Sequence, residues 1–242
     1  MNAPKTVLTK EEFSRRLNAG LGFSFTVHHG KNRNDHLAQL CDQYGSDKGE
    51  LQPSGHPYSW PSHNYTDFYS RLFGHCRTVI KSVFECGLGT NNPKLASSMG
   101  INGRPGASLR VWRDYFPNAN VYGADIDRAI LFQEDRIKTF FVDQCDPSAI
   151  RNLWKEVGHV SFDLMIDDGL HIFDAGSTFF THSIDQLADH GIYIIEDVSN
   201  SDLFLYKEFF SRLDYVVEFV NLFRPNLPLE SNSLVVVRKK IV

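Results

Sequence analysis

The stretch Met165-Ile-Asp-Asp-Gly-Leu-His171 sets two acids, a glycine and a histidine directly after an apolar run. Adjacent carboxylates repel each other, so the end of a buried segment suits them only if a cation or hydrogen-bond donors offset their charge. Glu196 and Asp197 follow a second apolar run in the same way. Carboxylate oxygens are the ligands that Mg²⁺ takes in proteins. Asp168, Glu196 and Asp197 are therefore candidate ligands of a divalent cation.

His171 adds a group that can move a proton. It comes three residues after Asp168, so both side chains can face one cavity. Histidine titrates near neutral pH and can accept a proton from a hydroxyl group. We expect Asp167 to orient its neighbours by hydrogen bonding. Taken singly, each of these residues also fits a simpler role as a helix cap or a solvated side chain, and only their coincidence favours a metal site.

The elements around these residues alternate between strands and helices. Apolar runs typical of strands lie at 79–84, 120–123, 138–142, 162–166, 192–195, 215–222 and 233–237. Patterns typical of helices lie at 108–116, 147–156, 172–188 and 202–212. This alternation predicts an α/β fold with a parallel sheet covered by helices on both faces. Because parallel strands end at one sheet edge, the acids that follow the first five runs should meet there.

The residues before this alternation have a different character. A capping box at Thr9 predicts a short helix at 10–18, and two more helices are expected at 35–44 and 64–73. We interpret 20–34 as a loop and 45–62 as a long connection. The sequence thus predicts an N-terminal helical extension, residues 1–78, ahead of a catalytic domain, residues 79–242.

The first strand of that domain ends in a glycine turn, Glu85-Cys-Gly-Leu-Gly-Thr90. Glycine lets the backbone approach a ligand closely. Asp125 ends the next strand, where a carboxylate can accept from both hydroxyls of a ribose. Asp143, with Gln144 beside it, ends the third strand and can accept from an adenine amino group. Together these positions predict a nucleoside site.

A dinucleotide site would need a third glycine running straight into a helix. Asn91, Asn92 and Pro93 follow the turn instead, and the next helix is capped only at Ser108. The turn therefore suits a ligand without a diphosphate and disfavours a nicotinamide-dependent oxidoreductase.

Several of these motifs resemble a known superfamily. The segments 85–89, 122–125 and 141–144 are similar to the cofactor-binding motifs of class I S-adenosylmethionine-dependent methyltransferases. The segments 166–171 and 194–197 resemble the metal-dependent macrolide-sugar O-methyltransferases of the mycinamicin and macrocin type, and related polysaccharide sugar methyltransferases. Tyr44-Gly-Ser-Asp-Lys-Gly49 and His63-Asn-Tyr65 look like the segment that precedes the catalytic domain in that group.

The resemblance implies a Rossmann-like, seven-stranded, mostly parallel sheet, with S-adenosylmethionine and Mg²⁺ or another divalent cation as cofactors. It implies Asp168, Glu196 and Asp197 as metal ligands, and His171 as the base with Asp168 beside it at the reaction centre. The cofactor-binding residues that we expect are Glu85, Gly87, Gly89, Thr90, Asp125, Asp143, Gln144, Asp167, Tyr44 and Lys48.

The expected reaction is methyl transfer to a hydroxyl of a sugar or glycosylated small molecule, as in antibiotic or surface-polysaccharide biosynthesis. A metal-dependent catechol or phenol methyltransferase stays open as an alternative, because a catechol also chelates through two oxygens. A cofactor-binding module without catalysis is disfavoured, because such a module needs no base beside a metal.

Composition sets the remaining limits. The chain has 242 residues, 42% of them hydrophobic, and a net charge of −4, which disfavours a protein that grips nucleic acid. Its four cysteines form no CxxC pair, and we expect them to be reduced thiols of a cytoplasmic protein. No apolar run has the length of a membrane span. A small-molecule acceptor and self-association into a homo-oligomer are the partners that we expect.

Overall fold

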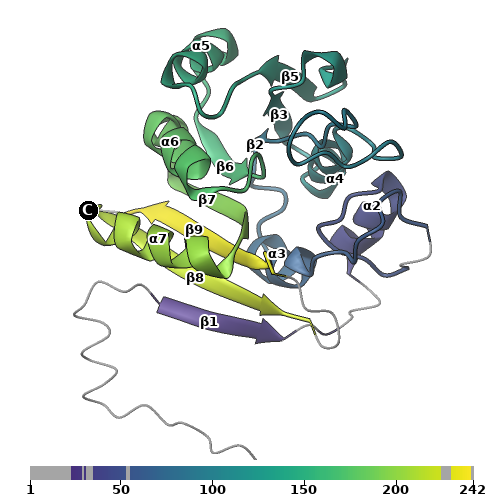
Figure 1. Cartoon of the computed structure of the whole chain (residues 1–242), viewed down its shortest axis with the longest axis horizontal. Coiled ribbons are helices and arrows are strands. Elements are labelled where there is room, and N and C mark those ends of the chain that lie inside the picture. The colour runs from purple at the N-terminus through teal and green to yellow at the C-terminus, as the bar shows by residue number, and fades with distance from the viewer. Residues whose placement is uncertain (1–22, 29, 31–34, 53–54, 225–229, 241–242) are drawn as a thin grey trace, which may run out of the picture.

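A nine-stranded sheet forms the centre of the protein in a computed structural model, which describes residues 23–28, 30, 35–52, 55–224 and 230–240. The strand order is β1-β8-β9-β7-β6-β2-β3-β5-β4 (Figure 1). The strands are β1 Phe23–His28, β2 Ser82–Cys86, β3 Asn120–Asp125, β4 Gln133–Glu134, β5 Ile137–Phe141, β6 Phe162–Asp167, β7 Leu187–Val198, β8 Tyr215–Phe223 and β9 Ser233–Lys239. Within the described residues, no helix is both long enough and apolar enough to cross a membrane.

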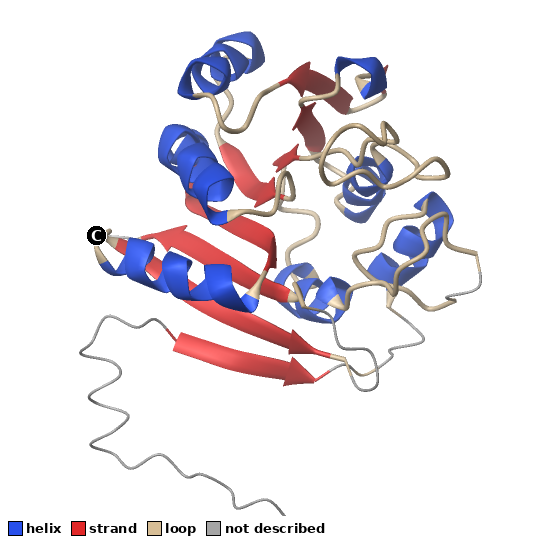
Figure 2. Ribbon diagram, in the orientation of Figure 1, coloured by secondary structure: helices blue, strands red, loops and turns tan. Residues whose placement is uncertain are grey.

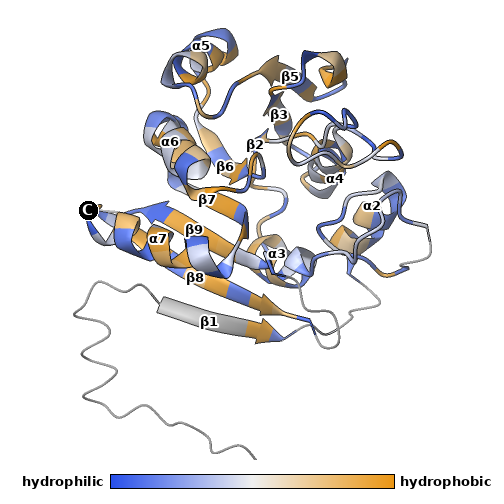
Figure 3. Ribbon diagram, viewed as in Figure 1, coloured by the Kyte–Doolittle hydropathy of each residue, from blue (hydrophilic) through white to orange (hydrophobic). Residues whose placement is uncertain are grey.

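Five neighbouring strands, β7, β6, β2, β3 and β5, run parallel, so their carboxyl ends share one edge. Strand β9 lies antiparallel between β7 and β8. The interior strands are predominantly hydrophobic along their length, as Figure 3 shows. Burial on both faces explains their apolar sequences, because a covered parallel strand has no face turned to water.

Helices cover both faces of the sheet (Figure 2). One core cluster joins the sheet to α2, α3 and α4, and a second joins it to α5, α6 and α7. Side chains alternate between them: Ile194 of β7 belongs to the first, and Tyr193 and Ile195 to the second. The helices are α2 His36–Tyr44, α3 Tyr65–Phe73, α4 Ala107–Tyr115, α5 Pro147–Val157, α6 Phe173–Ser183 and α7 Asn200–Ser211.

Side-chain caps define several helix starts. The Asp35 carboxylate accepts from the backbone N–H of Leu37 at 3.0 Å, and Asp146 caps α5 just before Pro147. The Ser199 hydroxyl accepts from the N–H of Asp202 at 3.1 Å and begins α7. These caps satisfy backbone donors that have no partner inside the helix.

The predicted α/β sheet and its covering helices are confirmed, with differences in detail. Two strands beyond the expected seven complete the sheet, and β1 lies in a stretch that we predicted to be a loop. This short strand gains its pairing from distant β8, where Phe23 is opposite Glu218, so local sequence carries little sign of it. The short helix expected at 10–18 lies outside the described residues.

The helix expected at 172–188 is shorter than predicted. It ends at Ser183, a 3₁₀ turn covers Ile184–Gln186, and β7 begins at Leu187. The start of β7 contains polar or flexible residues that are typical of turns: Asp189, His190 and Gly191.

The division at residue 78 stays a prediction. Helices α2 and α3, both from the expected extension, contribute Leu37, Tyr65 and Tyr69 to the core cluster that also holds Trp112 of α4. This part of the extension therefore shares one core with the sheet.

A substitution at Gly123 tests the contact between β3 and α4. A Cβ there would lie 2.6 Å from Leu109 Cδ1 and 2.7 Å from Leu88 Cδ2. We expect Gly123→Ala to lower the free energy of unfolding in urea by about 1–3 kcal/mol, because an overpacked core must shift. Gly55→Ala is the matched control, since a Cβ there would meet nothing within 4 Å. Equal stability of the two variants would contradict this packing.

Candidate active site

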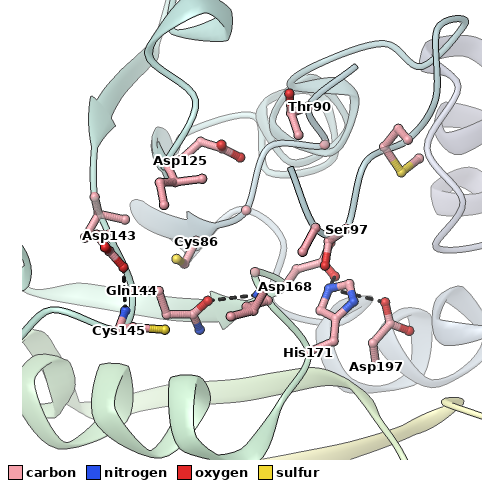
Figure 4. A pocket seen from close by; sticks show the side chains of 18 of the residues that line it. Cys86, Thr90, Ser97, Asp125, Asp143, Gln144, Cys145, Asp168, His171 and Asp197 are labelled. Carbon is pink, nitrogen blue, oxygen red and sulfur yellow. Dashed lines mark hydrogen bonds and ion pairs between the residues drawn. The ribbon is translucent and has the colours of Figure 1, made fainter. Parts of the chain in front are cut away.

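One cavity lies at the carboxyl edge of the parallel strands (Figure 4). Nine residues predicted for the site line it together: Gly87, Gly89, Thr90, Asp125, Asp143, Gln144, Asp168, His171 and Asp197.

The glycine turn needs its glycines for two reasons. Gly87 and Gly89 have φ values of +93° and +75°, a region that other residues rarely adopt. A Cβ on Gly87 would also lie 2.0 Å from the backbone oxygen of Asp168. The turn can therefore pass close to the end of β6 only without side chains.

Asp125 holds the turn in place. Its Oδ2 accepts from the backbone N–H of Leu88 at 2.7 Å, and its Oδ1 accepts from that of Asp127 at 2.8 Å. Burial raises the pKa of Asp125, although these hydrogen bonds oppose that rise. The carboxylate thus shapes the glycine turn as well as lining the cavity.

Gln144 links the ends of β5 and β6. Its Nε2 donates to Asp167 Oδ1 at 2.6 Å, and its Oε1 accepts from the N–H of Leu170 at 2.9 Å. Asp167 is only 3% exposed, and burial raises its pKa to about 6. Asp167 lies behind the cavity wall and contacts Gln144, so its contact with a cofactor stays a prediction.

Asp168, His171 and Asp197 present three possible ligand atoms within 4.8 Å of one another. His171 Nε2 lies 3.2 Å from Asp168 Oδ1 and 3.5 Å from Asp197 Oδ2, as the dashed lines in Figure 4 indicate. His171 and Asp197 both have left-handed backbones, with φ of +59° and +53°. Burial favours neutral His171, but the two carboxylates outweigh it and raise the pKa of His171 to about 10.

This cluster fits a divalent cation. His171 Nε2 is buried and makes no hydrogen bond of good geometry with any described residue, despite two nearby carboxylates. Carboxylate oxygens suit Mg²⁺, and an added imidazole nitrogen is a donor that transition metals also accept. The residues present can therefore hold such an ion.

Glu196 stands apart from the cluster although it was predicted as a ligand. It is 1% exposed, and its two oxygens accept from the Lys48 ammonium and the Tyr69 hydroxyl. The structure therefore brings together Asp168 and Asp197 but gives Glu196 other partners, and its role as a ligand stays a prediction.

Lys48 is the cation at the base of the site. Its Nζ lies 2.7 Å from Asp168 Oδ2 and 3.3 Å from Glu85 Oε1, and it also pairs with Glu196. Burial alone would lower the pKa of Lys48, but the three carboxylates hold it well above its usual value. The same ammonium, with His171, keeps the pKa of Asp168 below its usual range despite burial.

Four predicted cofactor residues do not line the cavity: Asp167 and Lys48, described above, and Glu85 and Tyr44. Glu85 is fully buried, where it accepts from the Trp112 indole and pairs with Lys48. The Tyr44 hydroxyl donates to Asp114. Their contact with a cofactor stays a prediction.

Several individual residues of the wall were not singled out from the sequence. The segment 91–107, which matched no motif, contributes Ala96, Ser97 and Met99 to the cavity. Ser97 has φ of +56°, a left-handed conformation that cannot be predicted from a serine in the sequence. Cys86 and Ile126, which follow predicted strands, also line the cavity. The other lining residues are Asp47, Val142, Cys145, Gly169 and Leu170.

Curated proteins similar to this chain are O-methyltransferases, although no family model matches it. It is 34% identical over 165 residues to the 8-demethyl-8-alpha-L-rhamnosyl tetracenomycin-C 2'-O-methyltransferase of Streptomyces olivaceus, covering 68% of this chain and 38% of that protein. It is 32% identical over 160 residues to the demethylmacrocin O-methyltransferase of Streptomyces fradiae, covering 65% of this chain and 38% of that protein. The chain thus spans under two fifths of the length of these relatives.

A solved structure with the same fold is the MycE methyltransferase from the mycinamycin biosynthetic pathway in complex with Mg and SAH. It superimposes with a TM-score of 0.58 at 24% identity, covering 87% of this chain and 56% of that one. The chain therefore has the class I methyltransferase fold, and the relatives named above are O-methyltransferases.

Proposed function

We propose that this chain is an S-adenosylmethionine-dependent O-methyltransferase that acts, with a divalent cation, on a hydroxyl of a sugar-containing small molecule. One observation carries the proposal: the glycine turn with Asp125 and Asp143 lines the same cavity as Asp168, His171 and Asp197. The homologues support the reaction class. Mg²⁺ is the first choice of metal because MycE was solved with it.

When bound, S-adenosylmethionine would supply the methyl group, and the metal would supply positive charge that favours loss of a hydroxyl proton. Gly87 and Gly89 give backbone access to the cofactor, and Asp125 is placed to accept from ribose hydroxyls. Asp143 and Gln144 line the opposite side of the cavity, where the adenine would lie.

His171 is the residue placed to take the proton. Its Nε2 faces the carboxylates of Asp168 and Asp197, which would bind the metal. These carboxylates raise the pKa of the imidazole to about 10, against the effect of burial. With a divalent cation on the same oxygens their charge would be offset, and the imidazole could then lose its proton and act as the base.

The acceptor class is the second part of the proposal. A sugar hydroxyl is preferred to a catechol because one relative named above is a methyltransferase of a rhamnosyl tetracenomycin. Self-association of this chain also stays a prediction.

Methyl transfer tests the reaction directly. We expect purified protein to move labelled methyl from S-adenosylmethionine to members of a panel of rhamnosides, other glycosides and catechols. EDTA should abolish the transfer and Mg²⁺ restore it, and His171→Ala should lower kcat by roughly 100-fold or more, as expected for loss of a general base. Activity that survives both chelation and the substitution would refute the metal and base assignments, and a preference for catechols would refute the acceptor class.

Asp125→Asn tests the cofactor site. The amide keeps one acceptor but loses the charge that strengthens the bonds to Leu88 and Asp127. We expect the Kd for S-adenosylhomocysteine, measured by calorimetry, to rise roughly tenfold or more, since bonds to charged groups contribute about 1.5–3 kcal/mol. Asp189→Asn, whose side chain is 98% exposed, is the matched control. Unchanged affinity in Asp125→Asn would count against a ribose-binding role.

The pKa of His171 predicts a pH dependence of stability without metal. It is about 10 in the folded protein against 6.5 as the ordinary value. The folded state thus holds a proton that the unfolded state releases, so this stabilisation is complete below pH 6.5 and is lost as the pH rises through 10.

We therefore expect the difference in unfolding free energy between wild type and His171→Asn to shrink from about pH 6 to about pH 10. Urea titrations in EDTA at several pH values measure it. A difference that stays constant or grows with pH would show that His171 has no raised pKa.

A further inference from the structure

The first residue of α3 makes two hydrogen bonds to one site residue. The Tyr65 hydroxyl donates to Asp197 Oδ1 at 2.7 Å. The oxygen of this hydroxyl also accepts from the backbone N–H of Asp197 at 3.1 Å. Tyr65 is 1% exposed, so water does not compete strongly for these bonds. The Tyr65 hydroxyl thus hydrogen-bonds to both the side chain and the backbone of Asp197.

These hydrogen bonds support an uncommon backbone conformation at Asp197. Its φ of +53° lies in the left-handed region, which is uncommon for residues other than glycine. The bond from its N–H to Tyr65 helps to hold this conformation at the end of β7. Without that bond, an extended conformation would direct the carboxylate elsewhere.

The bond to Oδ1 also determines which oxygen faces the cavity. With Oδ1 engaged by Tyr65, Oδ2 is the oxygen near His171 Nε2, at 3.5 Å. His63 strengthens the arrangement: its Nε2 lies 3.1 Å from Asp197 Oδ1, and its ring stacks on Tyr65 with centroids 4.4 Å apart. Both partners of Oδ1 therefore come from the segment that begins α3.

We propose that Tyr65 is a positioning residue that fixes Asp197 in its left-handed conformation with Oδ2 presented for metal binding. This inference rests on the proposed function, because it assumes that Asp168 and Asp197 bind a divalent cation. Tyr65 itself does not line the cavity, whereas Asp197 does. It gives α3 a specific task at the reaction centre in addition to its place in the core.

Tyr65→Phe is the direct test, because it removes only the hydroxyl. We expect the Kd for Mn²⁺, measured by electron paramagnetic resonance of the free ion, to rise roughly tenfold, the size typical of lost support behind a metal ligand. The Kd for S-adenosylhomocysteine, measured by calorimetry, should stay within about threefold, because the ribose and adenine positions are untouched. Tyr193→Phe is the matched control: Tyr193 is equally buried, and its hydroxyl has no hydrogen-bond partner among the described residues. It should bind Mn²⁺ as wild type does.

A double-mutant comparison shows whether the effect runs through Asp197. In an Asp197→Asn background, Tyr65→Phe should weaken Mn²⁺ binding little further, because the carboxylate that it positions is gone. Equal weakening in both backgrounds would overturn the inference, as would wild-type Mn²⁺ affinity in Tyr65→Phe. Loss of both Mn²⁺ and S-adenosylhomocysteine binding in Tyr65→Phe would also overturn it, by showing a general structural role. Failure of the wild type to bind Mn²⁺ would instead refute the proposed metal site.

Discussion

The site depends on one buried ammonium group. Lys48 Nζ pairs with Glu85, Asp168 and Glu196, which come from the ends of three neighbouring parallel strands. Carboxylates gathered this closely in a buried place would repel one another and take up protons. The ammonium lets them stay close, and so joins the glycine turn at the end of β2 to Asp168 after β6 and Glu196 near the end of β7. Because Lys48 comes from the segment before α3, that segment is part of the site.

Charge balance then explains why a cation suits the remaining space. Asp197 has no pairing with Lys48, and its Oδ2 faces His171 together with Asp168 Oδ1. The two carboxylates raise the pKa of His171 to about 10, so they favour its protonated form. In the proposed function, a divalent cation would take the place of that charge beside the same oxygens. Metal binding would then be linked to the release of the base.

Much of this architecture could be predicted from the sequence because the strands are short apolar runs with acids or glycines at their ends. Parallel strands bring those ends to one edge, so the sequence pattern alone is enough to expect Asp125, Asp143 and Asp168 in one cavity. The glycine turn could also be predicted from the sequence, because its two glycines directly follow a predicted strand.

The rest depended on contacts between residues distant in sequence. Nothing local predicts that Lys48 pairs with Glu85 and Glu196, or that Glu196 faces away from Asp197 although the two are adjacent. The direction of such side chains follows from the left-handed turn at Asp197, which its residue type does not specify. Strand β1 escaped prediction for a related reason, since its pairing partner β8 lies almost two hundred residues away.

The metal site can be tested with a crystal grown in Mn²⁺ and S-adenosylhomocysteine and measured at a wavelength where manganese scatters anomalously. If Asp168 and Asp197 hold a divalent cation, we expect an anomalous peak within coordination distance of Asp168 Oδ1 and Asp197 Oδ2. We also expect the ribose of the cofactor to lie on Asp125. Cofactor density in the cavity with no peak between those carboxylates would contradict the proposed metal site.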